Sequence, residues 1–121
     1  MDRKLTIIIP HPPKACWPNA RAHWGAISRA KRTLKQTTRL VAKSRWTQGE
    51  PMQKARVFVT WESATHQAPD PDNIIACLKG AFDGLEAAGI IENDRDLIPM
   101  PPTVRRKCPA PAVILDIEEI E

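Results

Sequence analysis

A chain of 121 residues, 42% of them hydrophobic, is long enough for one modest core, so we expect a single domain over residues 1–121. No run of eighteen apolar residues occurs, which argues against a membrane-spanning helix. The apolar run near the N-terminus is too short for a secretory signal and stops at Pro10, so we expect a cytoplasmic protein. The three cysteines are widely spaced without a CxxC pair, which argues against a disulfide framework or a zinc site.

The net charge of +4 hides a strong division along the chain. Residues 1–56 carry 13 Lys and Arg against 2 acids, whereas residues 57–121 carry 5 against 12. This polarity suits a protein whose basic half holds phosphates while its acidic half holds a metal ion. The alternative is a solvated helix that happens to be basic.

Residues 5–9 form a β-branched run that predicts the first strand, and a long proline-rich loop follows it. A loop of this length in so small a domain is usually functional. Aromatic side chains among basic ones suit contact with unpaired or distorted nucleic acid, by stacking and by phosphate contact. The loop residues in question are Lys14, Trp17, Asn19, Arg21 and Trp24. The alternative for the two tryptophans is that they only pack.

Residues 26–46 have the periodicity of a helix with two opposite stripes. The apolar stripe is Ile27, Ala30, Leu34 and Val41. The basic stripe is Arg29, Arg32, Arg39 and Lys43. A displacement of two residues is roughly 200° around a helix, so one stripe is expected to pack and the other to meet phosphate. No acid occurs between Asp2 and Glu50 to relieve the repulsion, which favours a polyanionic partner over plain solvated surface.

Further strands are expected at residues 55–62, where apolar and polar residues alternate, and at residues 112–117. Between them, a helix is expected from Asp70 to Ala88, ended by Gly89, and an interrupted edge strand over residues 97–107. The order strand, helix, strand, helix, strand, strand indicates an α+β domain. It would have a mixed sheet of about four strands and two main helices.

The stretch from Asp70 to Asp96 holds five of the seven aspartates. Asp70 is placed as an N-cap, followed by Pro71 at the first helical position. Asp94 follows the helix, and if its turn folds back, Asp70, Asp72 and Asp94 converge. Converging carboxylates without His or Cys indicate Mg²⁺, which takes oxygen ligands and can activate a water on a phosphodiester.

Along the same helix, Asp72, Lys79 and Asp83 fall at separations of 7 and 11, close to one line. A lysine there would offset the charge that builds on a phosphate in the transition state. The structural alternative is that the acids cap the helix and that Lys79 and Asp83 form only a surface ion pair.

These residues resemble the RusA family of Holliday-junction resolvases, and the resemblance spans essentially the whole chain. The family motif opens with Asp-x-Asp-Asn, continues with Lys and Asp on the helix and closes with an Asp-Asp pair. The matching positions are Asp70, Asp72, Asn73, Asp83 and Asp94. Asn93 stands where the closing pair has its first acid, and Lys79 lies seven residues after Asp72, whereas the best-known members place it four after.

The resemblance implies a Mg²⁺-dependent endonuclease, with Mn²⁺ as a possible substitute, that resolves four-way DNA junctions. It implies metal-binding roles for Asp70, Asp72 and Asp94, a catalytic Lys79, and supporting roles for Asp83 and Asn73. Cutting two strands at two-fold related positions calls for a homodimer.

Two other interpretations stay open. One is a branched-DNA binding protein that has lost catalysis, with Asn93 and the shifted Lys79 as its signs. The other is a small basic domain that binds RNA, which competition at fixed salt would distinguish.

Overall fold

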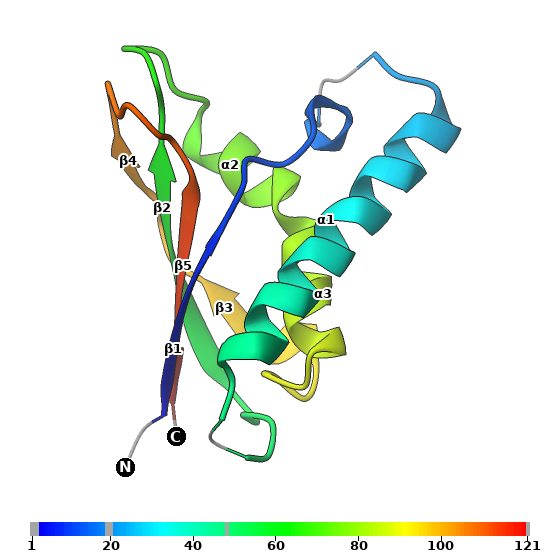
Figure 1. The fold of residues 1–121 in the computed structure, drawn as a ribbon, viewed down its shortest axis with the longest axis vertical. Coiled ribbons are helices and arrows are strands. Elements are labelled where there is room, and N and C mark those ends of the chain that lie inside the picture. Colours follow the sequence, from blue (N-terminus) through cyan, green and yellow to red (C-terminus); the bar gives the residue numbers. More distant parts are fainter. Residues whose placement is uncertain (1–2, 19–20, 48, 121) are drawn as a thin grey trace.

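In the computed structural model, which describes residues 3–18, 21–47 and 49–120, a mixed sheet carries helices on one of its faces (Figure 1). The helices are α1 (Trp24–Arg45), α2 (Pro71–Cys77), α3 (Lys79–Ala87) and the short 3-10 helices η1 (Lys14–Cys16) and η2 (Asp94–Asp96). The strands are β1 (Lys4–Ile9), β2 (Ala55–Glu62), β3 (Leu97–Pro99), β4 (Thr103–Arg105) and β5 (Val113–Glu119). The α+β class is confirmed, with three α-helices and five strands in the described residues where two and about four were expected.

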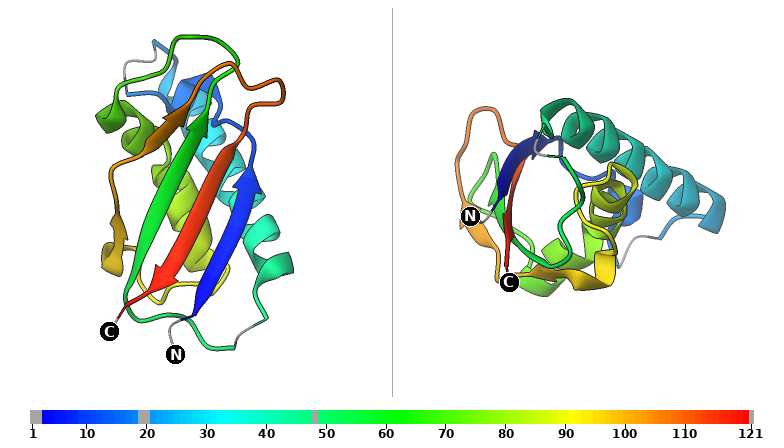
Figure 2. Two further views of the ribbon diagram at one scale, coloured as in Figure 1. Left: turned by 90° about the vertical axis from the view of Figure 1, so that its left-hand side faces the viewer. Right: turned by 90° about the horizontal axis from the view of Figure 1, so that it is seen from below.

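The sheet has the order β1-β5-β2-β3, and β4 also pairs with β2. Strand β5 runs antiparallel to β1 and β2, whereas β3 and β4 run parallel to β2. The predicted interrupted edge strand over residues 97–107 is confirmed as two three-residue strands, with Pro101 and Pro102 between them. Strand β2 lies inside the sheet, between β5 on one side and β3 and β4 on the other. Figure 2 shows that the helices cover one face of the sheet and leave the other open.

The core forms between that face and the helices because alternate strand residues point toward it. The buried strand residues are Leu5, Ile7 and Ile9 of β1, Val57, Val59 and Trp61 of β2, and Val113, Leu115 and Ile117 of β5. On α1 the buried residues are Leu34, Thr38 and Ala42, so the apolar stripe lies slightly off the predicted one and leaves Val41 half-buried. No helix within residues 3–18, 21–47 and 49–120 has the length and apolar character to cross a membrane.

The helix predicted from Asp70 to Ala88 is broken in two at Leu78. Leu78 has φ −94° and ψ 5°, and its N–H bonds to the Ile75 oxygen three residues back, which tightens the turn between α2 and α3. The side chain of Leu78 is fully buried, so packing outweighs the continuous helical periodicity of this segment. The predicted end is confirmed, because Gly89 follows α3 with a left-handed φ of 79°.

Two glycines of α3 let this helix lie directly against α1. A Cβ placed on Gly80 would be 3.0 Å from the Lys31 backbone oxygen, and one placed on Gly84 would be 2.6 Å from the Lys35 backbone oxygen. Side chains at these positions would therefore force the helices apart. The close approach places the basic helix α1 beside the helix that carries Lys79 and Asp83.

Candidate functional site

The first two candidate acids, Asp70 and Asp72, lie at the start of α2. Asp70 is the N-cap and its backbone oxygen accepts the Ile74 N–H at 3.0 Å, but its side chain makes no capping hydrogen bond. Both acids are exposed, and neither carboxylate has a hydrogen bond or an ion pair with any described residue. The predicted N-cap position of Asp70 is confirmed, but its side chain does not cap the helix, and both carboxylates are available to an external cation.

Asp72 also lines a groove of about 520 Å³ between α2 and the segment that follows β3. The other lining residues are Pro71, Ile75 and Ala76 of α2 and Pro99, Met100, Pro101 and Pro102 across from it. Asp72 is the only charged residue among them. Asn73, half-buried on the same first turn, forms no side-chain hydrogen bond with a described residue. The groove therefore offers an apolar wall next to an unpaired carboxylate.

A second polar cluster joins α3 to η2. The Lys79 ammonium donates to Asp94 Oδ2 at 2.6 Å and to Asp83 Oδ1 at 3.2 Å. The contact with Asp83 spans one helical turn, as the spacing predicted, whereas the contact with Asp94 joins residues 15 apart in the sequence. Asp83 thus contacts Lys79, the geometry that a supporting residue needs.

The two carboxylates of this cluster differ in acidity. The hydrogen bond from Lys79, followed by contact with Asp83, holds the pKa of Asp94 below its usual value. Burial, followed by contact with Asp94, raises the pKa of Asp83. The hydrogen bond to Asp94 is the main cause that raises the pKa of Lys79. Acid is therefore expected to protonate Asp83 before Asp94.

Carboxyl chemical shifts followed by NMR through an acid titration test this order. Because the pKa of Asp94 is lowered by folding, its ion pair stabilises the fold above the ordinary value of 3.8 and ceases to do so as the pH falls through the folded pKa. The pair is partly exposed, so we expect its contribution to be less than about 1 kcal/mol. Lys79→Met should raise the pKa of Asp94, while Lys43→Met, at an exposed position of α1, should leave it unchanged. A higher pKa for Asp94 than for Asp83 in the wild type would contradict this assignment.

The structure does not bring the three proposed metal ligands together. Within residues 3–18, 21–47 and 49–120, no group of three or more His, Cys, Asp and Glu side chains lies close enough to hold a metal ion. The expected convergence of Asp70, Asp72 and Asp94 is therefore corrected, because Lys79 holds Asp94 against α3. The donor chemistry of Asp70 and Asp72 alone still fits Mg²⁺, which is usually bound by one or two carboxylates together with waters and substrate phosphates.

The side chains of Asn93 and of Glu86, a residue for which the sequence predicted no role, fix the turn that carries Asp94. The Glu86 carboxylate accepts the Asp94 N–H at 2.8 Å, and Asn93 Oδ1 accepts the Arg95 N–H at 3.1 Å as the cap of η2. Asn93, in the position of the missing acid, therefore has a structural role. The sequence signal for this role is an Asn directly before a short helix, where Asn and Asp are common caps.

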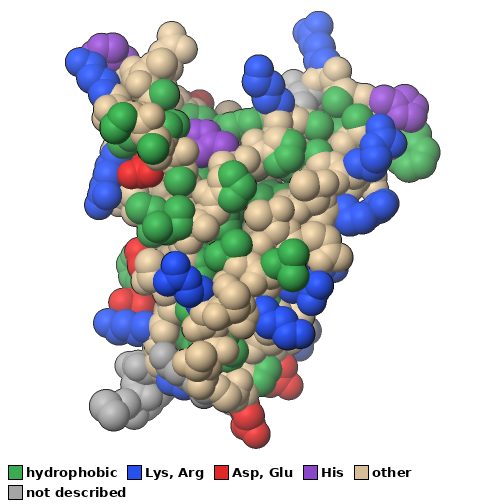
Figure 3. Space-filling model, viewed as in Figure 1, with side chains coloured by type: hydrophobic (Ala, Val, Ile, Leu, Met, Phe, Trp, Pro, Cys, Tyr) green, Lys and Arg blue, Asp and Glu red, His purple; other side chains and the backbone are tan. Residues whose placement is uncertain are grey.

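The basic stripe predicted on the first helix lies on the surface of the protein. Arg29, Arg32 and Lys43 are exposed, and Arg39 is half-buried and donates to Gln36 at 3.0 Å. In total α1 carries seven Lys and Arg and no acid, and none of them forms an ion pair with a described residue. Figure 3 shows Lys and Arg side chains along the side of the molecule formed by α1. This helix therefore presents uncompensated positive charge.

The two tryptophans predicted in the loop have different surroundings, and Trp24 belongs to α1 itself. Trp17 is half-buried and meets Trp61 edge-on with ring centroids 5.4 Å apart, so the packing alternative is correct for it. Trp24 is 76% exposed. Lys14 and Arg21 are exposed, and Asn19 lies outside the described residues.

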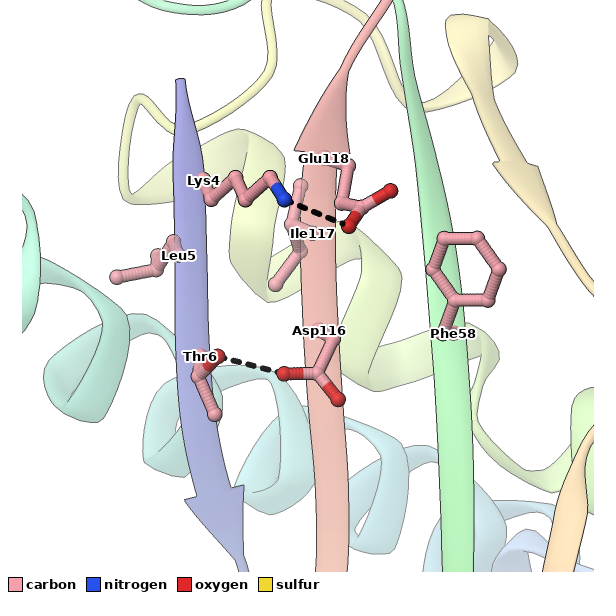
Figure 4. Close-up of a pocket in the computed structure, with 7 residues that line it drawn as sticks. All are labelled: Lys4, Leu5, Thr6, Phe58, Asp116, Ile117 and Glu118. Atoms are coloured by element: carbon pink, nitrogen blue, oxygen red, sulfur yellow. Dashed lines mark hydrogen bonds and ion pairs between the residues drawn. The ribbon is translucent and has the colours of Figure 1, made fainter. Parts of the chain in front are cut away.

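A separate hollow of about 350 Å³ lies on the open face of the sheet (Figure 4). Its polar groups satisfy one another: Thr6 Oγ1 donates to Asp116 Oδ1 at 2.5 Å, and Lys4 pairs with Glu118 at 3.3 Å. The remaining lining residues, Leu5, Phe58 and Ile117, are apolar. With its charges already paired, this hollow is a poor candidate for the functional site.

Comparison with known proteins adds no relative, because no protein-family model and no curated protein matches this chain.

Proposed function

We propose that this protein is a Mg²⁺-dependent endonuclease that cuts branched DNA, with four-way junctions as its substrate. The observation that carries the proposal is the pair of carboxylates at the start of α2, Asp70 and Asp72, which lack any partner in the described chain. The resemblance of Asp-Pro-Asp-Asn and the residues after it to the RusA motif supports the same assignment.

Asp70 and Asp72 would hold Mg²⁺, or Mn²⁺ in its place. The bound ion would supply an activated water and stabilise the leaving oxygen. Lys79 would offset charge on the phosphate. Its ammonium contacts both Asp83 and Asp94, which leaves a third N–H to donate to a phosphate oxygen. Asp83 would keep Lys79 near the site as a positioning residue.

The basic face of α1 would hold the DNA backbone. Its seven cations form no ion pair with any residue that the structure describes, so they can neutralise phosphates without first breaking one. Lys14 and Arg21, exposed before α1, would extend the same surface. Since a junction has two-fold symmetry, a homodimer would present two such sites.

We also propose that the protein works in the cytoplasm. The thiols of Cys16, Cys77 and Cys108 are free, which fits a reducing cytoplasm.

Cleavage of an end-labelled four-way junction tests the proposal. We expect paired nicks at two-fold related positions with Mg²⁺ or Mn²⁺, no nicks in a chelator, and no cutting of the matched duplex. An intact junction at saturating protein and metal would refute the nuclease assignment.

One observation favours a second candidate, a branched-DNA binding protein without catalysis. Asp94 is held by Lys79 and is not grouped with the other two acids. Such a protein would bind the junction without nicking it, and Asp72→Asn would change nothing. Stronger competition by RNA than by junction DNA would instead indicate an RNA-binding domain.

A further inference from the structure

Trp24, the first residue of α1, is the most exposed large hydrophobic residue that the structure describes. It is 76% exposed, compared with 59% for Leu40 and 58% for Ile8. Tryptophan is highly buried on average, because its large ring gains much from leaving water. A ring this exposed is therefore suited to a partner outside the folded chain.

The other three tryptophans are already engaged. Trp61 is 2% exposed in the core, and Trp17 packs against it. Trp46 donates from Nε1 to the Gly49 oxygen at 3.0 Å, and the Arg3 guanidinium lies 5.3 Å from its ring centroid. Trp24 is thus the indole ring available for stacking.

The surroundings of Trp24 are basic and partly fixed. His23 Nδ1 accepts the Gly25 N–H at 3.1 Å, and the His23 ring lies 5.7 Å from the Trp24 ring. A Cβ built on Gly25 would lie 3.6 Å from the Arg29 Nη1 atom, so the Arg29 guanidinium also lies over this turn. The exposed Trp24 ring therefore stands at the start of the basic helix α1, and the Arg29 guanidinium lies near the residue that follows it, Gly25.

We propose that Trp24 stacks on an unpaired or unstacked base of branched DNA while the cations of α1 hold the neighbouring phosphates. A flat aromatic ring next to positive charge matches the two parts of a nucleotide, and such stacking tolerates any base. Intact duplex has few exposed base faces, whereas a branch point has several. Trp24 would thus help the protein distinguish junctions from duplex. The inference depends on the DNA substrate of the proposed function, but not on cleavage.

Binding measured by fluorescence anisotropy, in a chelator and at one salt concentration, tests the proposal with labelled junction, single strand and duplex. Trp24→Ala should weaken junction and single-strand binding by about tenfold, the effect of losing one stacked base, and leave duplex binding nearly unchanged. Trp24→Phe should retain most of the affinity. Leu40→Ala, which removes another exposed apolar side chain of α1, is the matched control and should bind as the wild type does.

Intrinsic fluorescence provides a second readout. DNA should quench the tryptophan emission of the wild type and of Leu40→Ala, and the quenching should disappear in Trp24→Phe. Wild-type affinity in Trp24→Ala, or an equal loss for duplex and junction, would overturn the stacking proposal. If the wild type showed no preference for the junction, the proposed function itself would fail, and the role of Trp24 with it.

Discussion

Replacing Asp72 by Asn is expected to slow junction cleavage by at least about 10²-fold, a loss comparable to removing one electrostatic contact to the transition state. The amide keeps the shape of the side chain and removes its charge. Because Asp72 has no partner in the described chain and only the dipole of α2 favours its charge, folding stability should fall by less than about 1 kcal/mol. Junction binding should be preserved, since the cations of α1 supply it. Single-turnover cleavage and anisotropy on one labelled junction measure both quantities.

Glu92→Gln is the matched control for this substitution. Glu92 is exposed, lies in the same acidic half and has no side-chain hydrogen bond or ion pair with a described residue, so its neutralisation should leave the rate unchanged. Equal losses in Asp72→Asn and Glu92→Gln would show a nonspecific effect of charge, and wild-type cutting by Asp72→Asn would remove Asp72 from the mechanism.

The largest effect on stability is expected from Gly84→Val, which should lower the free energy of unfolding by about 3 kcal/mol, the upper part of the range for overpacked cores. The first added carbon would lie 2.6 Å from the Lys35 backbone oxygen and 2.9 Å from Thr38 Cβ, so α1 and α3 must separate. Valine regains only a few tenths of a kcal/mol of helix propensity over glycine, which does not offset this. Urea denaturation measures the change.

Ala87→Val on the exposed side of the same helix is the control and should cost only about 0.6 kcal/mol through helix propensity. Gly80→Ala should fall between the two variants, because its Cβ would be 3.0 Å from the Lys31 oxygen. If Gly84→Val were as stable as Ala87→Val, the close contact between the helices would be absent in solution.

The strands and the first helix could be predicted because their patterns are local. The alternation over residues 55–62 gave the bounds of β2, and the apolar run over residues 5–9 gave most of β1. The position of Gly89 indicated the end of α3. The break at Leu78 could not be predicted, because the helical periodicity continues through it and only the packing of Leu78 against the core decides it.

The candidate site could be predicted only in part, because the contacts of its side chains depend on the tertiary structure. The sequence places Asp70 and Asp72 at a helix start, but it does not show whether their side chains cap that helix. The contact between Lys79 and Asp94 depends on the turn at Asp94. The Glu86 side chain holds this turn from 8 residues earlier in the sequence, and no rule of residue spacing predicts such a contact. Only the fold distinguishes Trp24 from Trp17, because burial against Trp61 is a tertiary contact.

The most direct test of the account is to locate the divalent ion on the protein. Mn²⁺ added in small amounts to ¹⁵N-labelled protein broadens the amide signals nearest to it. We expect signals at the start of α2, around Asp70 and Asp72, to broaden first, and Asp72→Asn to abolish this effect. Selective broadening elsewhere, or none at Asp70 and Asp72 even with a junction bound, would contradict the metal site and the nuclease function together.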